Sequence, residues 1–515
     1  MEAFFNKLAA RPQRSIIIIS LLLLLAGNWI LPLTDRDEAR FGEASREMLQ
    51  RGDFIVPWFN GDWRFDKPVL IYWCQIASYC VLGTNGFAAR LPSVLFTTAT
   101  ALLLVRWGRK IADAKTGFLA GIMYVAGLHV AIIGRVATAD MAMVFFVTLA
   151  AWSGWELTRP DQVRRKLYWW IFYIAMAFGF LAKGPVAWLP LGGMIAGRMV
   201  QKDKFRLPVN ETFVGLCVTV ALVALWGGPA LQQTNGQFWS VGMGEHVFNR
   251  SIGVIDSHGL KGLAGFIALM PLYFVTFIVS FLPWTIGNPE VFESWFQKQR
   301  LKSVGWNLTI KILRGFSFFL FIPTNIMRWW PKRKSDDLGW YLFIQALLVF
   351  FIFSFVRTKL PHYTMPAFPC LSLWLALQIA RSPNIAAWAG KRLAAMTGFV
   401  LVVTLGFFPF AETHLLTENL WRATQSHLTP DTKIGCFGYT EPSQVWRFRS
   451  ITTNKVMLAD VKQARNFLTN TPPLMLVVPT SELAKLPDTN GTLISVEGLD
   501  MVKFRNWKLT ALIRP

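Results

Sequence analysis

The stretch that decides the fold is IIIISLLLLLAGNWILPL, residues 16–33, followed directly by TDRDEARFGE, residues 34–43. The apolar run is long enough to cross about 30 Å of hydrocarbon. It is too long for the apolar region of a secretory signal, and no small-residue cleavage site precedes the charged stretch. We therefore expect a first membrane-spanning helix that ends in a cluster of ionisable residues, and such clusters at a membrane boundary mark functional sites.

The composition predicts a polytopic α-helical membrane protein. Of the 515 residues, 53% are hydrophobic and only 16% are charged, and apolar runs of membrane-spanning length recur. A shorter apolar segment, 68–83, is expected to lie along the outer membrane interface, because a crossing there would export the basic cluster at 106–115. Further crossings are expected near 91–110, 116–134, 138–157, 167–182, 185–200, 212–230, 338–356, 362–380 and 393–411.

The net charge of +22 comes from short Lys and Arg clusters between apolar runs. This pattern is the positive-inside signal, it suits contact with anionic membrane lipids, and it argues against nucleic acid as a partner. It places the N-terminus inside and the 34–43 loop outside. In 264–337, two apolar runs surround a basic stretch. Because the loop before this region is expected outside and the basic residues 332–334 inside, only one net crossing fits, and one of the two runs is expected to be re-entrant or interfacial. The expected total is about 11 crossings, with 13 as the alternative.

Beyond Phe410 no run is long enough to span, and short β-prone segments alternate with a helical pattern near 455–468. We expect a transmembrane domain over 1–411, with interfacial helices in its outer loop 34–90, and a small soluble α/β domain over 412–515. An odd number of crossings places this second domain outside. The five cysteines form neither a metal spacing nor a disulfide framework.

The charged stretch after the first run predicts a short helix from about Asp35 to Arg51. Residues spaced three or four apart share one helix face, so Asp37 and Arg40 are expected to point the same way. The alternative is an amphipathic interfacial helix whose charges are only solvated.

Five other charged clusters occupy loops that the topology places outside. Four of them have a purely structural alternative: an interfacial anchor for Asp66–Lys67, a helix cap for Asp140, snorkelling for Lys183, and a structural role for His246. The clusters are Asp66–Lys67, Arg135–Asp140, Lys183, Glu245–His246 with Arg250, and Lys359–Tyr363. Together with the first helix they place Asp37, Asp66 and Asp140 among several cations on one membrane face, which suits a phosphate-bearing substrate and a hydroxyl that loses its proton.

At these residues the chain resembles the GT-C glycosyltransferases. The resemblance is to the bacterial branch that includes the lipid A 4-amino-4-deoxy-L-arabinose transferases and the protein O-mannosyltransferases. The resemblance covers nearly the whole chain and is carried, in the family's order, by Asp37-Glu38-Ala39-Arg40-Phe41, Asp66-Lys67-Pro68, Ala89-Arg90-Leu91-Pro92, Arg135 with Asp140, Lys183-Gly184-Pro185, Glu245-His246 with Arg250, and Lys359-Leu360-Pro361-His362-Tyr363.

The resemblance implies a GT-C fold and an inverting transfer of a sugar from a polyprenyl (undecaprenyl) phosphate carrier to a periplasmic acceptor, at the bacterial inner membrane. Asp37 would orient or deprotonate the acceptor, supported by Asp140. The carrier phosphate would be held by Lys67, Arg250, Arg40, Lys183 and Tyr363, with Asp66, Glu245, His246 and Lys359 as additional pocket residues.

The acceptor implied is lipid A or another envelope glycan. A protein hydroxyl, as in an O-mannosyltransferase, remains an alternative, and so does a transporter or flippase for a lipid-linked sugar. No nucleotide cofactor is needed. A divalent metal ion is left open, with Asp66 as the candidate ligand.

Overall fold

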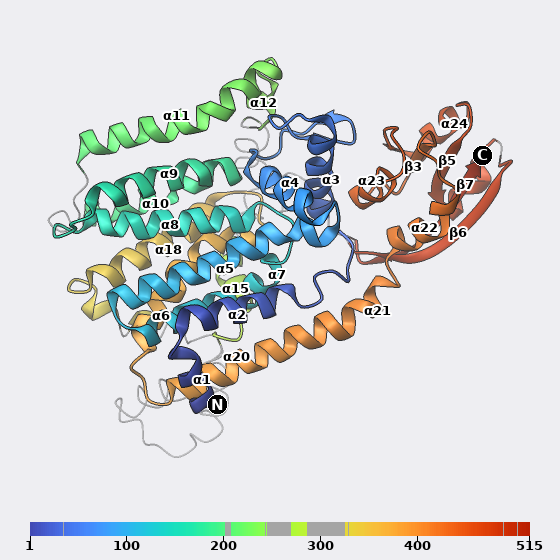
Figure 1. Ribbon diagram of the computed structural model, residues 1–515. Helices are drawn as coiled ribbons and strands as arrows, with labels where there is room; N and C mark the ends of the chain where they lie inside the picture. Colours follow the sequence, from blue (N-terminus) through green and yellow to red (C-terminus); the bar gives the residue numbers. More distant parts are fainter. Residues whose placement is uncertain are drawn as a thin grey trace.

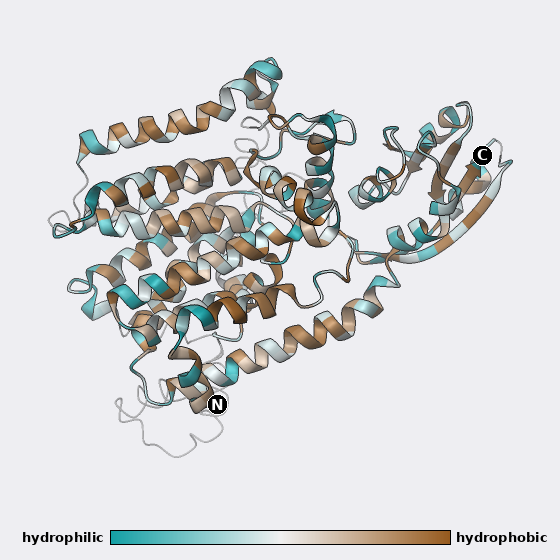
Figure 2. Ribbon diagram, in the orientation of Figure 1, coloured by the Kyte–Doolittle hydropathy of each residue, from teal (hydrophilic) through white to brown (hydrophobic). Residues whose placement is uncertain are grey.

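The computed structural model describes residues 1–33, 36–200, 208–242, 244, 269–285, 325–327 and 329–515, except 488 and 502. Long helices lie roughly side by side, and a smaller part with a β-sheet lies beyond one end of them (Figure 1). Apolar residues dominate the long helices, whereas polar residues gather at α3 (Arg36–Arg51) and in the sheet-containing part (Figure 2). The chain is a multi-pass α-helical membrane protein.

The helical part has the following described elements. They are α1 (Glu2–Ala9), α2 (Pro12–Leu25), α3, α4 (Leu70–Leu82), α5 (Gly86–Ile111), α6 (Ala114–Val125), α7 (Leu128–Ile133), α8 (Asp140–Thr158), α9 (Arg165–Lys183), η1 (Gly184–Trp188), α10 (Leu189–Val200), α11 (Val209–Gln233), α12 (Gln237–Trp239), α15 (Leu272–Ser280), η3 (Trp330–Lys332), α18 (Asp337–Phe355), η4 (Pro361–Ala367), α19 (Phe368–Ile379), α20 (Ile385–Leu401), the π-helix η5 (Val402–Phe407) and α21 (Phe408–Glu412). A two-stranded hairpin, β1 (Trp58–Phe59) with β2 (Asp62–Trp63), lies between α3 and α4.

Helices occupy the positions of the predicted crossings. In the described residues, six helical stretches are long and apolar enough to cross a membrane, and α1 with α2, bent by 112°, would make a seventh if the pair forms one span. One of the six, 165–197, contains α9, η1 and α10, where two crossings were expected at 167–182 and 185–200. The expected crossings at 116–134 and 362–380 correspond to the shorter helices α6 and α19. The total stays a prediction, because most of the two apolar runs in 264–337 lies outside the described residues.

The sequence predicted that the first apolar run forms one helix up to Leu33, and this prediction is wrong. The helix α2 ends at Leu25, and turns follow. Gly27 adopts a positive φ of 67°, and an added Cβ there would lie 2.6 Å from the carbonyl oxygen of Thr404. Only glycine tolerates both this conformation and this close approach. The chain therefore leaves the helix early to pack against η5.

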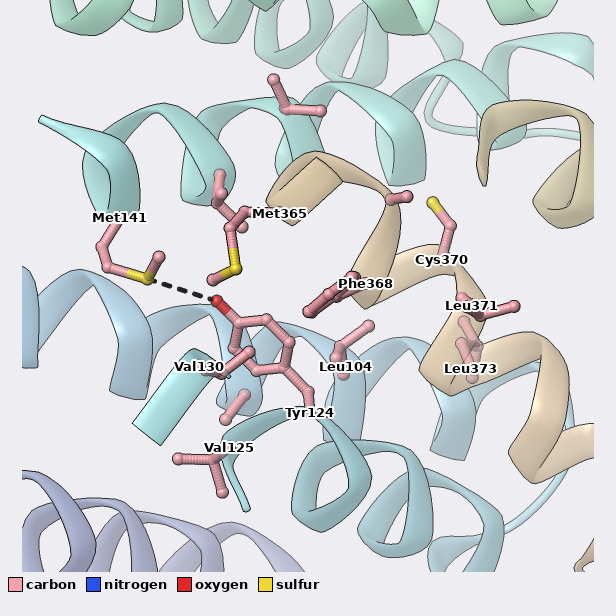
Figure 3. Packing of buried hydrophobic residues seen from close by; sticks show 14 of the residues in the cluster. Leu104, Tyr124, Val125, Val130, Met141, Met365, Phe368, Cys370, Leu371 and Leu373 are labelled. Carbon is pink, nitrogen blue, oxygen red and sulfur yellow. Dashed lines mark hydrogen bonds between the residues drawn. The ribbon is translucent and has the colours of Figure 1, made fainter. Parts of the chain in front are cut away.

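The core of the bundle places η4 beside α8. Tyr124 of α6 is fully buried, and its hydroxyl lies 3.8 Å from the sulfur of Met141 on α8 (Figure 3). Met365 of η4 and Phe368 at the start of α19 pack in the same buried cluster. Because this packing fixes η4, the residues at its start are held next to the beginning of α8.

A buried ion pair fixes α3 to the bundle. Arg90 of α5 donates two hydrogen bonds of 2.8 Å to the carboxylate of Glu38, and both side chains are buried. The same guanidinium donates to the carbonyl oxygens of Asn28, Leu31 and Pro32, and Glu38 also accepts from the amide of Ala137. The pair therefore joins α3 and the segment just before it to α5 and to the loop before α8.

The C-terminal part contains a mixed five-stranded sheet in the order β4-β3-β5-β7-β6. Strands β4, β3 and β5 are parallel, and β7 pairs antiparallel with β5 and β6. The β-prone segments predicted beyond Phe410, at 433–439, 474–479, 492–496 and 507–512, contain the strands β3, β5, β6 and β7, but the helical pattern near 455–468 also contains a strand, because β4 pairs with β3. The elements are α22 (Leu416–Thr424), η6 (Gln425–His427), β3 (Lys433–Phe437), α23 (Pro442–Phe448), β4 (Met457–Ala459), η7 (Val461–Gln463), α24 (Ala464–Phe467), β5 (Leu474–Pro479), η8 (Thr480–Lys485), β6 (Thr492–Asp500) and β7 (Arg505–Arg514).

The sheet-containing part contacts both ends of α3. At the first turn, Arg36 forms two hydrogen bonds with the carboxylate of Glu441, at 3.1 and 3.3 Å. Further along, the Arg46 guanidinium lies 4.6 Å from the centre of the Trp446 ring and donates to its carbonyl oxygen at 3.0 Å. Asn60, in the hairpin after α3, exchanges two hydrogen bonds with the backbone of Val456.

A carboxyl group is buried in this interface. Glu43 is fully buried and pairs with Arg46, and the guanidinium of Arg449 lies 3.8 Å away. Burial raises the pKa of Glu43 to about 8, although Arg46 and Arg449 oppose the rise, and the neighbouring Glu47 adds to it.

We predict that Arg90→Gln lowers the free energy of unfolding by about 3–5 kcal/mol, because it leaves the Glu38 carboxylate buried without its ion-pair partner. Thermal unfolding of the detergent-purified protein measures the loss as a lower midpoint. Arg106→Gln, at an exposed position of the same helix, should leave the midpoint unchanged. Equal midpoints for Arg90→Gln and wild type would show that the pair does not hold α3.

We also predict that Glu43 makes the stability fall as the pH rises from about 4.5 to about 8. Over this range the folded protein keeps a proton on Glu43 that the unfolded chain releases. Glu43→Gln cannot ionise, so its unfolding midpoint should rise relative to wild type between pH 5 and pH 8.5. The exposed Glu2→Gln serves as the control, and pH profiles of the same slope for Glu43→Gln and wild type would contradict the assignment.

Candidate functional site

Polar residues from four segments meet in one cavity of about 430 Å³. The loop after β2 supplies Asp66 and Lys67, and Asp140 is the first residue of α8. Lys183 is the last residue of α9, and Tyr363 comes from η4 together with His362. Four of the predicted phosphate-site and catalytic residues, Lys67, Asp140, Lys183 and Tyr363, therefore line one space.

The rest of the cavity wall is apolar. It is formed mainly by α11, by the residues that follow α11, and by the end of α18. The apolar side chains include Phe180, Val220, Val223, Leu231, Phe238 and Phe353. The cavity thus combines a charged end with a long hydrophobic surface, the arrangement that an amphiphile with an anionic head requires.

Asp140 and Lys183 form an ion pair at the charged end. The N-terminus of α8 favours a carboxylate and the C-terminus of α9 favours a cation, so each helix stabilises the group it carries. The ammonium of Lys183 also lies 5.9 Å from the centre of the Tyr363 ring. Lys183 therefore does not snorkel into solvent, and the N-cap residue of α8 is Ala139 and not Asp140.

Asp66 and Lys67 sit where the loop meets α4. The ammonium of Lys67 donates to the backbone carbonyl of Asp66 at 3.0 Å, and the Asp66 carboxylate lies 2.9 Å from the guanidinium of Arg64. An interfacial anchor at this segment would place the nearby Tyr72 in an aromatic belt at the membrane surface. The Tyr72 side chain is instead fully buried and packs against Phe41.

Arg64 is a site residue that the sequence reasoning missed. It is buried, donates to the hydroxyl of Tyr72 at 3.1 Å, and lies 5.2 Å from the centre of the Phe41 ring. Burial alone would lower the pKa of Arg64, but Tyr72 and Asp66 outweigh it and hold that pKa above its ordinary value. A sequence signal existed, because residues two apart in an extended segment point to the same side, as Arg64 and Asp66 do.

Asp37 and Arg40 lie on the first turns of α3, as predicted, but neither is among the residues that line the cavity. Asp37 is exposed and Arg40 is half-buried. Burial raises the pKa of Tyr72 to about 12, and the negative charges of Asp66 and Asp37 add to this rise. Asp37 is therefore close enough to act on the cluster behind the cavity while its carboxylate stays accessible to water.

Lys359 is placed at the end of α18. Its ammonium donates to the carbonyl oxygens of Phe353 and Ser354, at 2.9 and 2.6 Å, and lies 5.3 Å from the centre of the Tyr273 ring. Burial lowers the pKa of Lys359 to about 8. These contacts satisfy carbonyls at a helix C-terminus, so the described geometry gives Lys359 a capping role.

Three predicted site residues, Glu245, His246 and Arg250, lie outside the described residues. Within the part of the chain that the structure describes, no group of three or more His, Cys, Asp or Glu side chains is arranged to hold a metal ion. Asp66, the candidate metal ligand, faces Arg64.

The sequence has relatives among lipid-linked sugar transferases. A family model described as "Dolichyl-phosphate-mannose-protein mannosyltransferase" matches residues 66–226. An undecaprenyl phosphate-alpha-4-amino-4-deoxy-L-arabinose arabinosyl transferase of Pectobacterium atrosepticum is 34% identical over 237 residues, which are 44% of this chain and 41% of that protein. An uncharacterized protein of Aquifex aeolicus is 36% identical over 178 residues, 34% of this chain and 40% of that protein. The matches thus span about two fifths of these curated relatives.

The fold has close counterparts of known structure. ArnT from Cupriavidus metallidurans, bound to undecaprenyl phosphate, aligns with a TM-score of 0.69 over 97% of this chain and 98% of that chain, at 17% identity. The archaeal oligosaccharyltransferase AglB from Archaeoglobus fulgidus aligns with a TM-score of 0.52 over 93% of this chain and 70% of that chain, at 12% identity. The chain has the fold of these membrane proteins, and it resembles the GT-C glycosyltransferases in sequence and fold. Its particular likeness is to the aminoarabinose transferases.

Proposed function

We propose that this protein is an inverting glycosyltransferase that moves a sugar from a polyprenyl phosphate carrier, undecaprenyl phosphate in bacteria, to an acceptor hydroxyl. The observation that carries the proposal is the cavity with Lys67 and Lys183 at one end and an apolar wall elsewhere. The lysines would bind the carrier phosphate, and the apolar wall would bind the isoprenoid chain.

The charge distribution supports this reaction. When the bond between the anomeric carbon and the phosphate oxygen breaks, the leaving phosphate gains negative charge. Cations that are already held in place, such as Lys183 by Asp140 and Tyr363, stabilise that charge without rearranging. Arg250 and Arg40 are further phosphate ligands under this proposal, on the strength of the family resemblance.

The acceptor hydroxyl would lose its proton to Asp37, and its oxygen would attack the anomeric carbon from the side opposite the leaving phosphate, inverting the configuration. The exposure of Asp37 supports this role, because an acceptor can reach it from the aqueous side. Asp140 would act indirectly, by orienting Lys183 at the phosphate.

We propose lipid A or a related envelope glycan as the acceptor, an inner-membrane location, and a periplasmic orientation for the site and for residues 412–515. The basic clusters support this orientation. Lys110 at the basic end of α5 pairs with Glu156 at the end of α8, so the basic end of α5 lies beside the end of α8 that is opposite Asp140. The likeness to the aminoarabinose transferases supports lipid A as the acceptor.

We predict that Asp37→Asn lowers the transfer rate by about 10²–10⁴-fold, the range for loss of a general base. Purified protein, radiolabelled undecaprenyl phosphate-sugar and lipid A measure the rate. Because Asp37 is exposed, the unfolding midpoint should not change. Asp62→Asn, at an exposed carboxylate of the β1–β2 hairpin, is the matched control.

Three outcomes of this assay would decide against parts of the proposal. Full activity of Asp37→Asn would remove Asp37 as the base. Transfer to peptide serine or threonine, and not to lipid A, would favour a protein O-mannosyltransferase. Labelled sugar that crosses liposomes without leaving its carrier would favour a transporter.

For the orientation, we predict that a cysteine replacing Lys462 reacts with a membrane-impermeant maleimide added to spheroplasts. A cysteine replacing Lys166 should react only after the membrane is opened. Both positions are exposed, so accessibility alone does not distinguish them. A variant without the five native cysteines is the background. Protection of the cysteine at 462 would reverse the proposed orientation.

A further inference from the structure

The guanidinium of Arg64 lies directly behind the carboxylate of Asp66, which lines the cavity. The two groups are 2.9 Å apart, and Arg64 is only 8% exposed whereas the Asp66 side chain is 27% exposed. The carboxylate thus faces the cavity, and the cation that neutralises it is buried.

The contacts of Arg64 hold it in one orientation. Its Nε donates to the hydroxyl of Tyr72, its Nη2 faces Asp66, and its central carbon lies 5.2 Å from the centre of the Phe41 ring. A guanidinium that is held by such contacts loses little conformational freedom when it binds a carboxylate. Phe41 belongs to α3, so this cluster also joins the cavity to the helix that carries Asp37.

The net charge of the residues that line the cavity shows how Arg64 affects anion binding. With histidine neutral, the charged residues that line the cavity are Asp66, Lys67, Asp140 and Lys183, two of each sign. Such a set gives a phosphate no net attraction. Arg64 adds one positive charge from behind the wall, and in a site of low polarity this charge acts strongly on an anion.

We propose that Arg64 is a positioning residue for the carrier phosphate: it neutralises and orients the Asp66 carboxylate, and thereby lets the charged end of the cavity accept an anion. This inference rests on the proposed function, because it assumes that a polyprenyl phosphate occupies the cavity.

A double-mutant cycle of charge-neutralising substitutions tests the proposal. The dissociation constant of undecaprenyl phosphate is measured for the purified wild type, Arg64→Gln, Asp66→Asn and the double variant. We expect Arg64→Gln to weaken binding at least about tenfold, because a full negative charge then faces the phosphate. Asp66→Asn should bind at least as tightly as wild type, and the double variant should return to within about threefold of it.

The double variant separates charge from packing. If Arg64 only supports Phe41 and Tyr72, removing Asp66 cannot repair its loss, so a double variant as weak as Arg64→Gln would overturn the inference. Arg64→Lys keeps the charge and should stay within about threefold of wild type. If Arg64→Gln does not fold, the inference stands or falls on Asp66→Asn and Arg64→Lys, and tenfold weaker binding by either would overturn it.

The wild type distinguishes this inference from the proposed function. Wild-type protein that binds undecaprenyl phosphate no better than uncharged undecaprenol would overturn both. Tight binding of the phosphate by wild type, without rescue in the double variant, would overturn only the role of Arg64.

Discussion

The burial of Glu38 and Arg90 is the constraint on which the rest of the structure depends. Two charges removed from water are tolerated only when each satisfies the other with good geometry, and here the pair uses both carboxylate oxygens. The remaining donors of Arg90 bind backbone carbonyls of the segment before α3, and Glu38 binds the loop before α8. The first turns of α3 and the start of α8 are thereby set relative to one another. Asp37 and Asp140 acquire their positions from a pair that is not among the residues lining the candidate cavity.

The charged residues of the candidate site lie at or near the ends of helices. Asp140 begins a helix, Lys183 ends one, and Lys67 precedes another. The N-terminus of α8 stabilises the carboxylate of Asp140 and the C-terminus of α9 stabilises the ammonium of Lys183, because the unpaired backbone groups at each helix end favour a charge of opposite sign. A membrane protein that collects several such termini at one end obtains a charged site without burying charge in the middle of the bilayer, where it costs most.

Much of this arrangement could be predicted from the sequence, for identifiable reasons. Apolar runs and basic clusters obey one-dimensional rules, so the helices, and the grouping of Lys67, Asp140, Lys183 and Tyr363, followed from them. Arg64 was missed because its importance comes from Tyr72 and Phe41, which reach it only in the folded state. The early end of α2 depends on Gly27 meeting Thr404, a contact across almost 400 residues. The strand β4 likewise exists because β3 lies beside it.

The contacts of α3 with the sheet-containing part have a consequence for biosynthesis. Arg36 and Arg46 emerge early from the ribosome, whereas their partners Glu441 and Trp446 are made some 400 residues later. Until then the residues of the C-terminal part that bury Glu43 are missing, so its carboxylate is exposed to water. The surroundings of α3 are thus completed last, by the final part of the chain, and a protein truncated before Glu441 and Trp446 lacks these contacts.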